Sequence, residues 1–220
     1  PIRNNEIYMS LLRGIAVPII ENQLLCYIFA YGNMHRAKLV EALNNFPLDI
    51  GHHRIIDWGC GQGIGCLLYL EKLAENGLQE TCSKIILVEP SEIALRRAAL
   101  HIQHRIEDIT THNKDIDSIS EDDFEFSDDI PSVHIFSNIL DIEMFSLQHL
   151  ISIIDSCFKG TNYFIITSPN INVTRVSRIN AFVSHYRNNG GFVNYYSSDA
   201  GRGQWQCGWT KIIRVFRAEI

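Results

Sequence analysis

The stretch RIIDWGCGQGIG, residues 54–65, places four glycines at alternating positions soon after a short apolar run that ends in Asp57. Glycine loses more backbone freedom on folding than any other residue, so such a cluster needs a local reason. One reason is a tight turn with positive φ, and another is a ligand that has to contact the main chain. The stretch therefore predicts a strand, a glycine loop and a helix, with the loop as the first candidate for a binding site.

Apolar runs of strand length alternate with amphipathic stretches of helix length beyond this loop. This alternation implies right-handed βαβ crossovers and a mostly parallel sheet. The last two strands have no helix between them, which predicts an antiparallel hairpin at the sheet edge. We therefore expect an α/β fold with a mostly parallel, seven-stranded, doubly wound sheet. The strands are expected within residues 54–58, 84–90, 106–116, 132–140, 162–169, 190–198 and 210–220, and the helices at 63–77, 91–105, 143–158 and 173–188.

The chain before the glycine loop has a helical pattern without strands. Residues 6–45 have helical spacing, and Pro47 and Gly51 then break the pattern. We expect an N-terminal helical cap over residues 1–48 and an α/β domain over residues 49–220. Three side chains of the cap, Tyr27, Tyr31 and His35, recur at every fourth position and are interpreted as core packing.

The composition of the chain narrows the classes of protein to which it can belong. The 220 residues are 46% hydrophobic, enough for one sizeable core, and the net charge of −6 argues against a strongly basic nucleic-acid binder. The run GIAVPII, residues 14–20, is too short to span a membrane. The six cysteines form no C-x-x-C pair, which favours reduced thiols in a cytoplasmic protein. The acidic run at residues 121–129 is interpreted as a solvated loop, and no metal site is expected.

The glycine spacing separates several classes of ligand. A P-loop requires a lysine after its glycines, whereas this chain has Cys66 and two leucines there. A dinucleotide fingerprint G-x-G-x-x-G would need its third glycine at Ile64. The observed spacing is D-x-G-x-G-x-G, from Asp57 to Gly63.

This spacing resembles the first motif of the class I S-adenosylmethionine-dependent methyltransferases, and the resemblance continues in order along residues 50–220. It implies a Rossmann-like methyltransferase domain that binds S-adenosylmethionine. Glu89, at the end of IILVEP, matches the acid that binds the two ribose hydroxyls in that family. Asp115 or Asp117 matches the side chain that bonds the adenine amine, and HIFSNILDI matches the fourth motif, which flanks the sulfonium. The donor-binding residues implied are Asp57, Gly59, Cys60, Gly61, Gly63, Glu89, Pro90, Asp115 and Ser137.

Asp57 has an alternative interpretation, and the position of Glu89 departs from the usual spacing. Asp57 is expected to bind or orient the methionine amino group, although an acid at a strand end can also cap the following turn. Glu89 follows Asp57 by 32 residues, where about 20 is usual for a dinucleotide-type loop. We place the excess in a lengthened loop at residues 75–83, because loop insertions cost little.

The methyl acceptor is less visible in the sequence. The tetrad SNIL differs from the [N/D]-P-P-[Y/F/W] form of the amino-group methylases and resembles family members that act on small molecules, RNA or proteins. A small-molecule acceptor is favoured because the net charge is acidic and the chain has no basic stripe, with RNA or protein as alternatives. Asn138 is the candidate catalytic residue. An equally favoured interpretation is that its polar side chain only satisfies backbone hydrogen bonds at the end of a strand. Arg202 and Trp205, in the hairpin connection, are candidates for a substrate wall.

Other polar residues are given structural roles. We expect Asp141 to cap the next helix and His134 to be buried and satisfied within a strand. Two other classes of function remain open: a silent methyltransferase-like binding or regulatory module, and a nicotinamide-dependent oxidoreductase. Methyl transfer from a sulfonium depends mostly on alignment, so a catalytic base need not be visible in the sequence.

Overall fold

The computed structural model describes residues 4–124, 130–188 and 191–220. Its centre is one seven-stranded sheet with the order β3-β2-β1-β4-β5-β7-β6. Six strands run in the same direction and β7 is antiparallel to both of its neighbours. The predicted sheet with its C-terminal antiparallel hairpin is therefore confirmed. The strands are β1 (His53–Trp58), β2 (Cys82–Val88), β3 (Ile109–His112), β4 (Ser132–Ser137), β5 (Thr161–Ser168), β6 (Val193–Ala200) and β7 (Lys211–Glu219).

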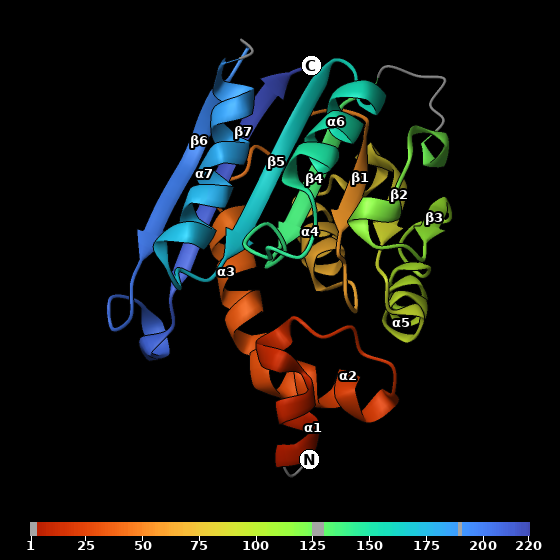
Figure 1. Cartoon of the computed structure of the whole chain (residues 1–220). Helices are drawn as coiled ribbons and strands as arrows, with labels where there is room; N and C mark the ends of the chain where they lie inside the picture. The colour runs from red at the N-terminus through yellow and green to blue at the C-terminus, as the bar shows by residue number, and fades with distance from the viewer. Residues whose placement is uncertain (1–3, 125–129, 189–190) are drawn as a thin grey trace.

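Helices cover both faces of this sheet (Figure 1). Because neighbouring residues of a strand point to opposite faces, Ile55 packs toward α4 while Ile56 packs toward α6. One core lies under α3, α4 and α5, and the other lies under α6 and α7. The helices are α1 (Asn5–Ser10), α2 (Glu21–Tyr27), α3 (Asn33–Leu43), α4 (Ile64–Glu75), α5 (Glu92–Ile102), α6 (Leu147–Cys157) and α7 (Val173–Asn188).

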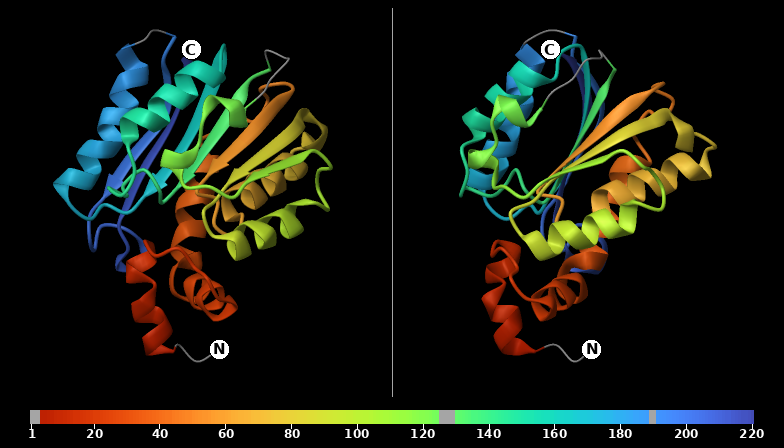
Figure 2. Two further views of the ribbon diagram at one scale, coloured as in Figure 1. Left: turned by 45° about the vertical axis from the view of Figure 1, so that its right-hand side comes forward. Right: turned by 90° about the vertical axis from the view of Figure 1, so that its right-hand side faces the viewer.

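The N-terminal helices lie at the end of the sheet where its parallel strands finish (Figures 1 and 2). Helix α3 continues from this end along the sheet, where it packs against β5 and β7. Polar contacts tie the earlier segment to the loops there: Gln62 Nε2 donates to the carbonyl of Leu24 over 3.1 Å, and Arg97 pairs with Glu21. In open α/β sheets this is the end at which ligands bind.

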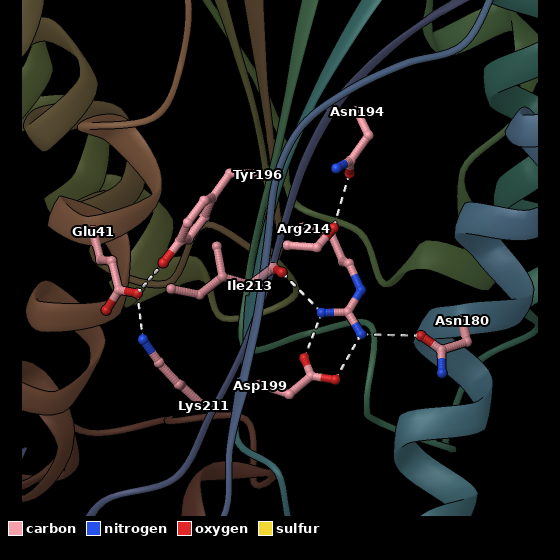
Figure 3. Close-up of polar contacts among 9 residues, drawn as sticks. Glu41, Asn180, Asn194, Tyr196, Asp199, Lys211, Ile213 and Arg214 are labelled. Atoms are coloured by element: carbon pink, nitrogen blue, oxygen red, sulfur yellow. Dashed lines mark hydrogen bonds and ion pairs between the residues drawn. The ribbon is translucent and has the colours of Figure 1, made fainter. Parts of the chain in front are cut away.

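The C-terminal hairpin is fastened on both of its sides (Figure 3). Toward α3, the carboxylate of Glu41 accepts from Tyr196 Oη at 2.7 Å and pairs with Lys211. Toward α7, Arg214 pairs with Asp199 of β6 and also donates to the side-chain oxygen of Asn180 over 3.2 Å. In the strand order β4, β5 and β7 separate β6 from β1, so the hairpin lies at the edge of the sheet and away from the strand that leads into the glycine loop.

The cap of α6 differs from the expected one, and the acidic run is described only in part. Asp141 does not cap the following helix: α6 begins at Leu147, and Ser146 is the cap, with its hydroxyl accepting from His149 N. The acidic run at residues 121–129 is described only as far as residue 124, and the rest lies outside the described residues. No helix in the described part of the chain is long and apolar enough to cross a membrane.

Candidate functional site

Glycine is required at the four loop positions for different structural reasons. Gly59, Gly61 and Gly63 have φ between 54° and 83°, a region that side chains rarely adopt. A Cβ on Gly63 would lie 3.1 Å from Ala98, and a Cβ on Gly65 would lie 2.9 Å from the Asp57 carboxylate, so these two allow close packing. A Cβ on Gly61 would meet nothing within 4 Å. Gly61 therefore presents bare main chain to open space, as ligand contact requires.

The carboxylate of Glu89 lies against this bare main chain. Its Oε2 accepts from Gly61 N over 2.9 Å, and its Oε1 accepts from Ser91 N, also over 2.9 Å. Burial raises the pKa of the Glu89 carboxyl, and the two N–H groups act against this change by favouring the ionised form. The lengthened loop between β1 and β2 thus leaves Glu89 beside the glycine loop. The Glu89 carboxylate, a buried acceptor with two oxygens, therefore lies where a pair of hydroxyls could bind.

Asp57 lies behind the loop and is fully buried. Its Oδ2 accepts from Cys66 N at 3.1 Å, which satisfies one N–H group at the start of α4. Its Oδ1 has no hydrogen-bond partner among the described residues. Burial raises the pKa of this carboxyl to about 7. The geometry supports the helix-capping role, while a contact with a methionine amino group stays a prediction.

Two cavities border the loop, and a third adjoins them. The first, of about 120 Å³, is lined by Gly61, Glu89, Pro90 and Ser137, with residues 14–18 of the N-terminal segment on its other side. The second, of about 250 Å³, is mostly apolar and follows the loop from Gly59 to Gln62. The third, of about 420 Å³, lies toward β5 and α7. The side chain of Tyr27 lines all three, so they form neighbouring parts of one site.

Asn138 lies where the first and third cavities meet. It follows β4 directly and has a φ of 62°, a sparsely populated conformation for a residue other than glycine. Its side-chain oxygen accepts from Lys38 Nζ, and its Nδ2 donates to Ser137 Oγ over 3.1 Å. Backbone strain and a fixed amide at the junction of two cavities are typical of a functional position. The catalytic role of Asn138 stays a prediction.

Lys38 is a member of this site that the sequence did not reveal. Its side chain is 0% exposed, and burial lowers the pKa of its amine to about 7, with Asp141 acting in the opposite direction. Lysine at a helical position is usually interpreted as exposed. The only signal in the sequence was that position 38 adjoins the apolar stripe of α3.

The third cavity combines an aromatic wall with a buried ion pair. Tyr8 and Tyr31 stack with ring centroids 6.1 Å apart, and Tyr31 stacks on His35 at the same distance. Burial lowers the pKa of His35 to about 3, so its imidazole is neutral at physiological pH. Asp141, 2% exposed, accepts from Arg175 Nη1 at 3.2 Å. The rings of Tyr27, Tyr31 and His35 do pack against one another, as expected, but they also line this cavity.

Three predicted residues lie away from these cavities. Asp115 is exposed, and its carboxylate accepts from Ser118 N within a local turn. Asn113 lies nearer, because its Nδ2 donates to the carbonyls of Glu89 and Pro90. Arg202 and Trp205 are not among the lining residues of the three cavities. Trp205 instead lies under Lys211, with Nζ 5.0 Å from the ring centroid.

The remaining candidates behave as packing residues. His134 is fully buried, accepts from Trp58 Nε1 and contacts Asn162 Oδ1, which confirms the expectation of a satisfied core histidine. Cys60 is buried within the loop, and burial raises the pKa of its thiol. All six cysteines are free thiols. Among the described residues no group of three or more His, Cys, Asp or Glu side chains could hold a metal ion.

Solved structures with this architecture are numerous. An S-adenosylmethionine-dependent methyltransferase from Mesorhizobium loti has a TM-score of 0.55 at 13% identity, with 82% of this chain and 97% of that chain covered. The N-methyltransferase NodS from Bradyrhizobium japonicum WM9 has a TM-score of 0.53 at 10% identity, covering 87% and 98%. Magnesium protoporphyrin IX methyltransferase from Synechocystis PCC 6803, solved with bound S-adenosylmethionine, has a TM-score of 0.52 at 11% identity, covering 96% and 91%.

Comparison of the sequence with protein-family profiles and with curated proteins finds no match. The structural similarity is therefore a similarity of fold, and the sequence identities are too low to indicate which substrate this chain binds. The seven-stranded sheet with its C-terminal antiparallel hairpin and flanking helices is the α/β methyltransferase fold that those solved structures share. The chain has the fold of the class I S-adenosylmethionine-dependent methyltransferases.

Proposed function

We propose that this protein is a methyltransferase that uses S-adenosylmethionine as its methyl donor. The observation that carries the proposal is the pairing of Glu89 with the open main chain at Gly61. A buried carboxylate beside bare backbone at the end of β1 suits a ribose with two hydroxyls and a chain that follows the loop. The fold supports methyl transfer in general terms.

Each part of the donor has candidate partners in the described residues. Glu89 would accept from the ribose hydroxyls, and Pro90 lines the wall on which an adenine could lie. Gly59, Cys60, Gly61 and Gly63 would contact the methionine end, where α4 begins. Ser137 and Asn138 would lie beside the sulfonium, as the resemblance of the fourth motif implies. When bound, the donor supplies an activated methyl group on a positively charged sulfur.

The protein's own contribution is alignment and exclusion of water. Residues 14–18 cover the first cavity, and the hydroxyl of Ser91 donates to the carbonyl of Pro18, which ties this cover to the start of α5. We propose that residues 1–48 act as a helical cap that closes over the donor. Tyr27 belongs to this cap and would separate the donor loop from the third cavity.

The acceptor is proposed to be a small molecule. The third cavity, of about 420 Å³, has the size of a site for a ring system or a comparable compound, and Asn138 connects it to the donor side. The net charge of −6 also gives no electrostatic reason to bind RNA. A protein or RNA acceptor would have to insert one residue or base into this cavity.

Calorimetry with S-adenosylmethionine and with NAD tests the proposed function. We expect one S-adenosylmethionine per chain to bind with a Kd of about 1–100 μM, and no binding of NAD. Absence of methyl-donor binding would contradict the proposal, and binding of NAD alone would favour an oxidoreductase. A silent module with an intact loop would bind the donor yet transfer no methyl group to any acceptor that occupies the third cavity.

A further inference from the structure

We infer that the third cavity takes a flat, uncharged ring that carries an N–H or O–H donor, and that Asp141 selects this acceptor. The inference rests on the proposed function, because it names the substrate class of the same site. It depends on three features of the cavity: a wall of aromatic rings, a buried carboxylate with an unpartnered oxygen, and positive groups that already balance its charge.

The aromatic wall explains why the ligand should be flat. Tyr8, Tyr31 and His35 stack one after another, and Tyr27 meets Tyr31 edge-on with ring centroids 5.2 Å apart. All four side chains line the same cavity. A π-helical turn, Ile28–Gly32, lies between Tyr27 and His35 and departs from regular α-helical spacing. Offset or edge-on contact with such rings favours a planar partner.

Asp141 explains why the ligand should donate a hydrogen bond. Its side chain is buried and lines the cavity, and its Oδ2 is engaged by Arg175. Its Oδ1 is also buried but has no hydrogen-bond partner among the described residues. The nearby Ser168 hydroxyl favours the ionised carboxyl, but neither its oxygen nor Asp141 Oδ1 has a partner in hydrogen-bonding geometry among the described residues. A buried acceptor without a donor is costly, and a ligand N–H or O–H would satisfy it.

The charges around Asp141 explain why the ligand should be neutral. Arg175 pairs with Asp141, and the buried amine of Lys38 also acts on this carboxyl. A cationic ligand would meet the Arg175 guanidinium, which lines the cavity, while an anionic ligand would meet the carboxylate itself. The neutral imidazole of His35 adds a polar group without charge. Charge balance therefore favours a neutral donor, such as a ring N–H, an aromatic amine or a phenol.

Three planar probes of similar shape test the inference: indole, which donates; 1-methylindole, which has no N–H; and quinoline, which accepts. Their binding is measured by ligand-observed NMR with S-adenosylhomocysteine present. We expect indole to bind at least about tenfold more tightly than either of the others, since a buried acceptor is left unpaired without it. Equal binding of the three probes, or no binding of indole, would overturn the inference.

The variant Asp141→Asn sharpens the test. The amide oxygen should stay toward the Arg175 guanidinium, which can only donate, so the NH₂ group takes the place of the unpartnered oxygen. We expect the preference to reverse, with quinoline now binding more tightly than indole. If indole remains preferred, or if a trapped water satisfies Oδ1 and the variant changes nothing, Asp141 does not select the ligand.

Failure of this inference can be told apart from failure of the proposed function. Calorimetry with S-adenosylhomocysteine is run on the same samples of the wild type and of Asp141→Asn. Retained binding of this product together with probes that show no preference would contradict the acceptor class alone. Loss of product binding in the wild type would contradict the proposed function itself. A second variant, Asp141→Leu, removes the acceptor altogether and should give equal binding of indole and 1-methylindole.

Discussion

The glycine loop and the cavity around Asp141 adjoin at Asn138, but they are assembled in different ways. The proposed donor side comes from a loop that follows β1 and an acid that follows β2, which are neighbouring strands. The proposed acceptor side joins the N-terminal helices, the loop after β4 and the start of α7, which are distant in sequence. The first side is thus encoded by local backbone needs, whereas the second is created by tertiary packing.

The largest expected effect comes from filling the open space at Gly61. We expect Gly61→Val to weaken S-adenosylmethionine binding by a hundredfold or more, about 2.7 kcal/mol, because its side chain would occupy the place of the donor. Calorimetry measures the loss.

Gly51→Val is the matched control for this variant. Gly51 also has positive φ, 75°, and a Cβ there also meets nothing within 4 Å, but it lies before β1 and away from the cavities. Both variants should lose similar stability through backbone strain, about 1–2 kcal/mol. Equal donor affinity in the two variants would show that the loop is merely a turn.

The next effect concerns the acid at the second strand. We expect Glu89→Gln to lower donor affinity about tenfold to a hundredfold, since a charged acceptor with two oxygens becomes a neutral amide with one. Glu92→Gln is the control, because Glu92 is exposed on the outside of α5, where it pairs with Arg96. If the two variants bind the donor equally well, Glu89 does not hold the ribose.

Asp57 gives a prediction of pH dependence. Its pKa in the fold is raised from 3.8 to about 7, so the folded protein binds more protons than the unfolded chain between these values. The stability that this group contributes is therefore present below about pH 4 and is lost as the pH rises through 7. Replacement by asparagine removes this loss while an amide oxygen can still accept from Cys66 N.

Chemical denaturation of the wild type and of Asp57→Asn at several pH values measures this effect. We expect the stability of the variant relative to the wild type to rise by on the order of 2 kcal/mol between pH 5 and pH 8. Glu89 is present in both proteins, so only its coulombic coupling to Asp57 enters the difference. A difference that does not change with pH would show that Asp57 is not a raised-pKa group.

The smallest effect concerns Lys38, on the acceptor side. Its pKa in the fold is lowered from 10.5 to about 7, so the unfolded chain binds more protons between these values and the wild type gains stability as the pH rises through this range. We expect Lys38→Met to reduce this gain, measured by denaturation at pH 7 and pH 9. An unchanged pH dependence would mean that the amine is charged throughout in the fold.

The contrast between the two sides also explains what the sequence could predict. A backbone with positive φ at Gly59 and Gly61 requires glycine, so the residue type itself made the loop predictable. The alternation of apolar runs with helical stretches made the mostly parallel sheet predictable. Asp141 was expected to cap a helix, because nothing in the sequence places Arg175 of α7 beside it. Lys38 was overlooked for the same reason, since only tertiary contacts show that its amine is buried. Trp205 was predicted to lie near the donor because the sequence does not show that β4, β5 and β7 separate β6 from β1.

A crystal structure of the protein with S-adenosylhomocysteine tests the central claim most directly. The account predicts both ribose hydroxyls within hydrogen-bonding distance of the Glu89 carboxylate, and the homocysteine part along Gly59–Gly63. A ligand bound elsewhere, or a ribose held by a residue other than Glu89, would contradict it.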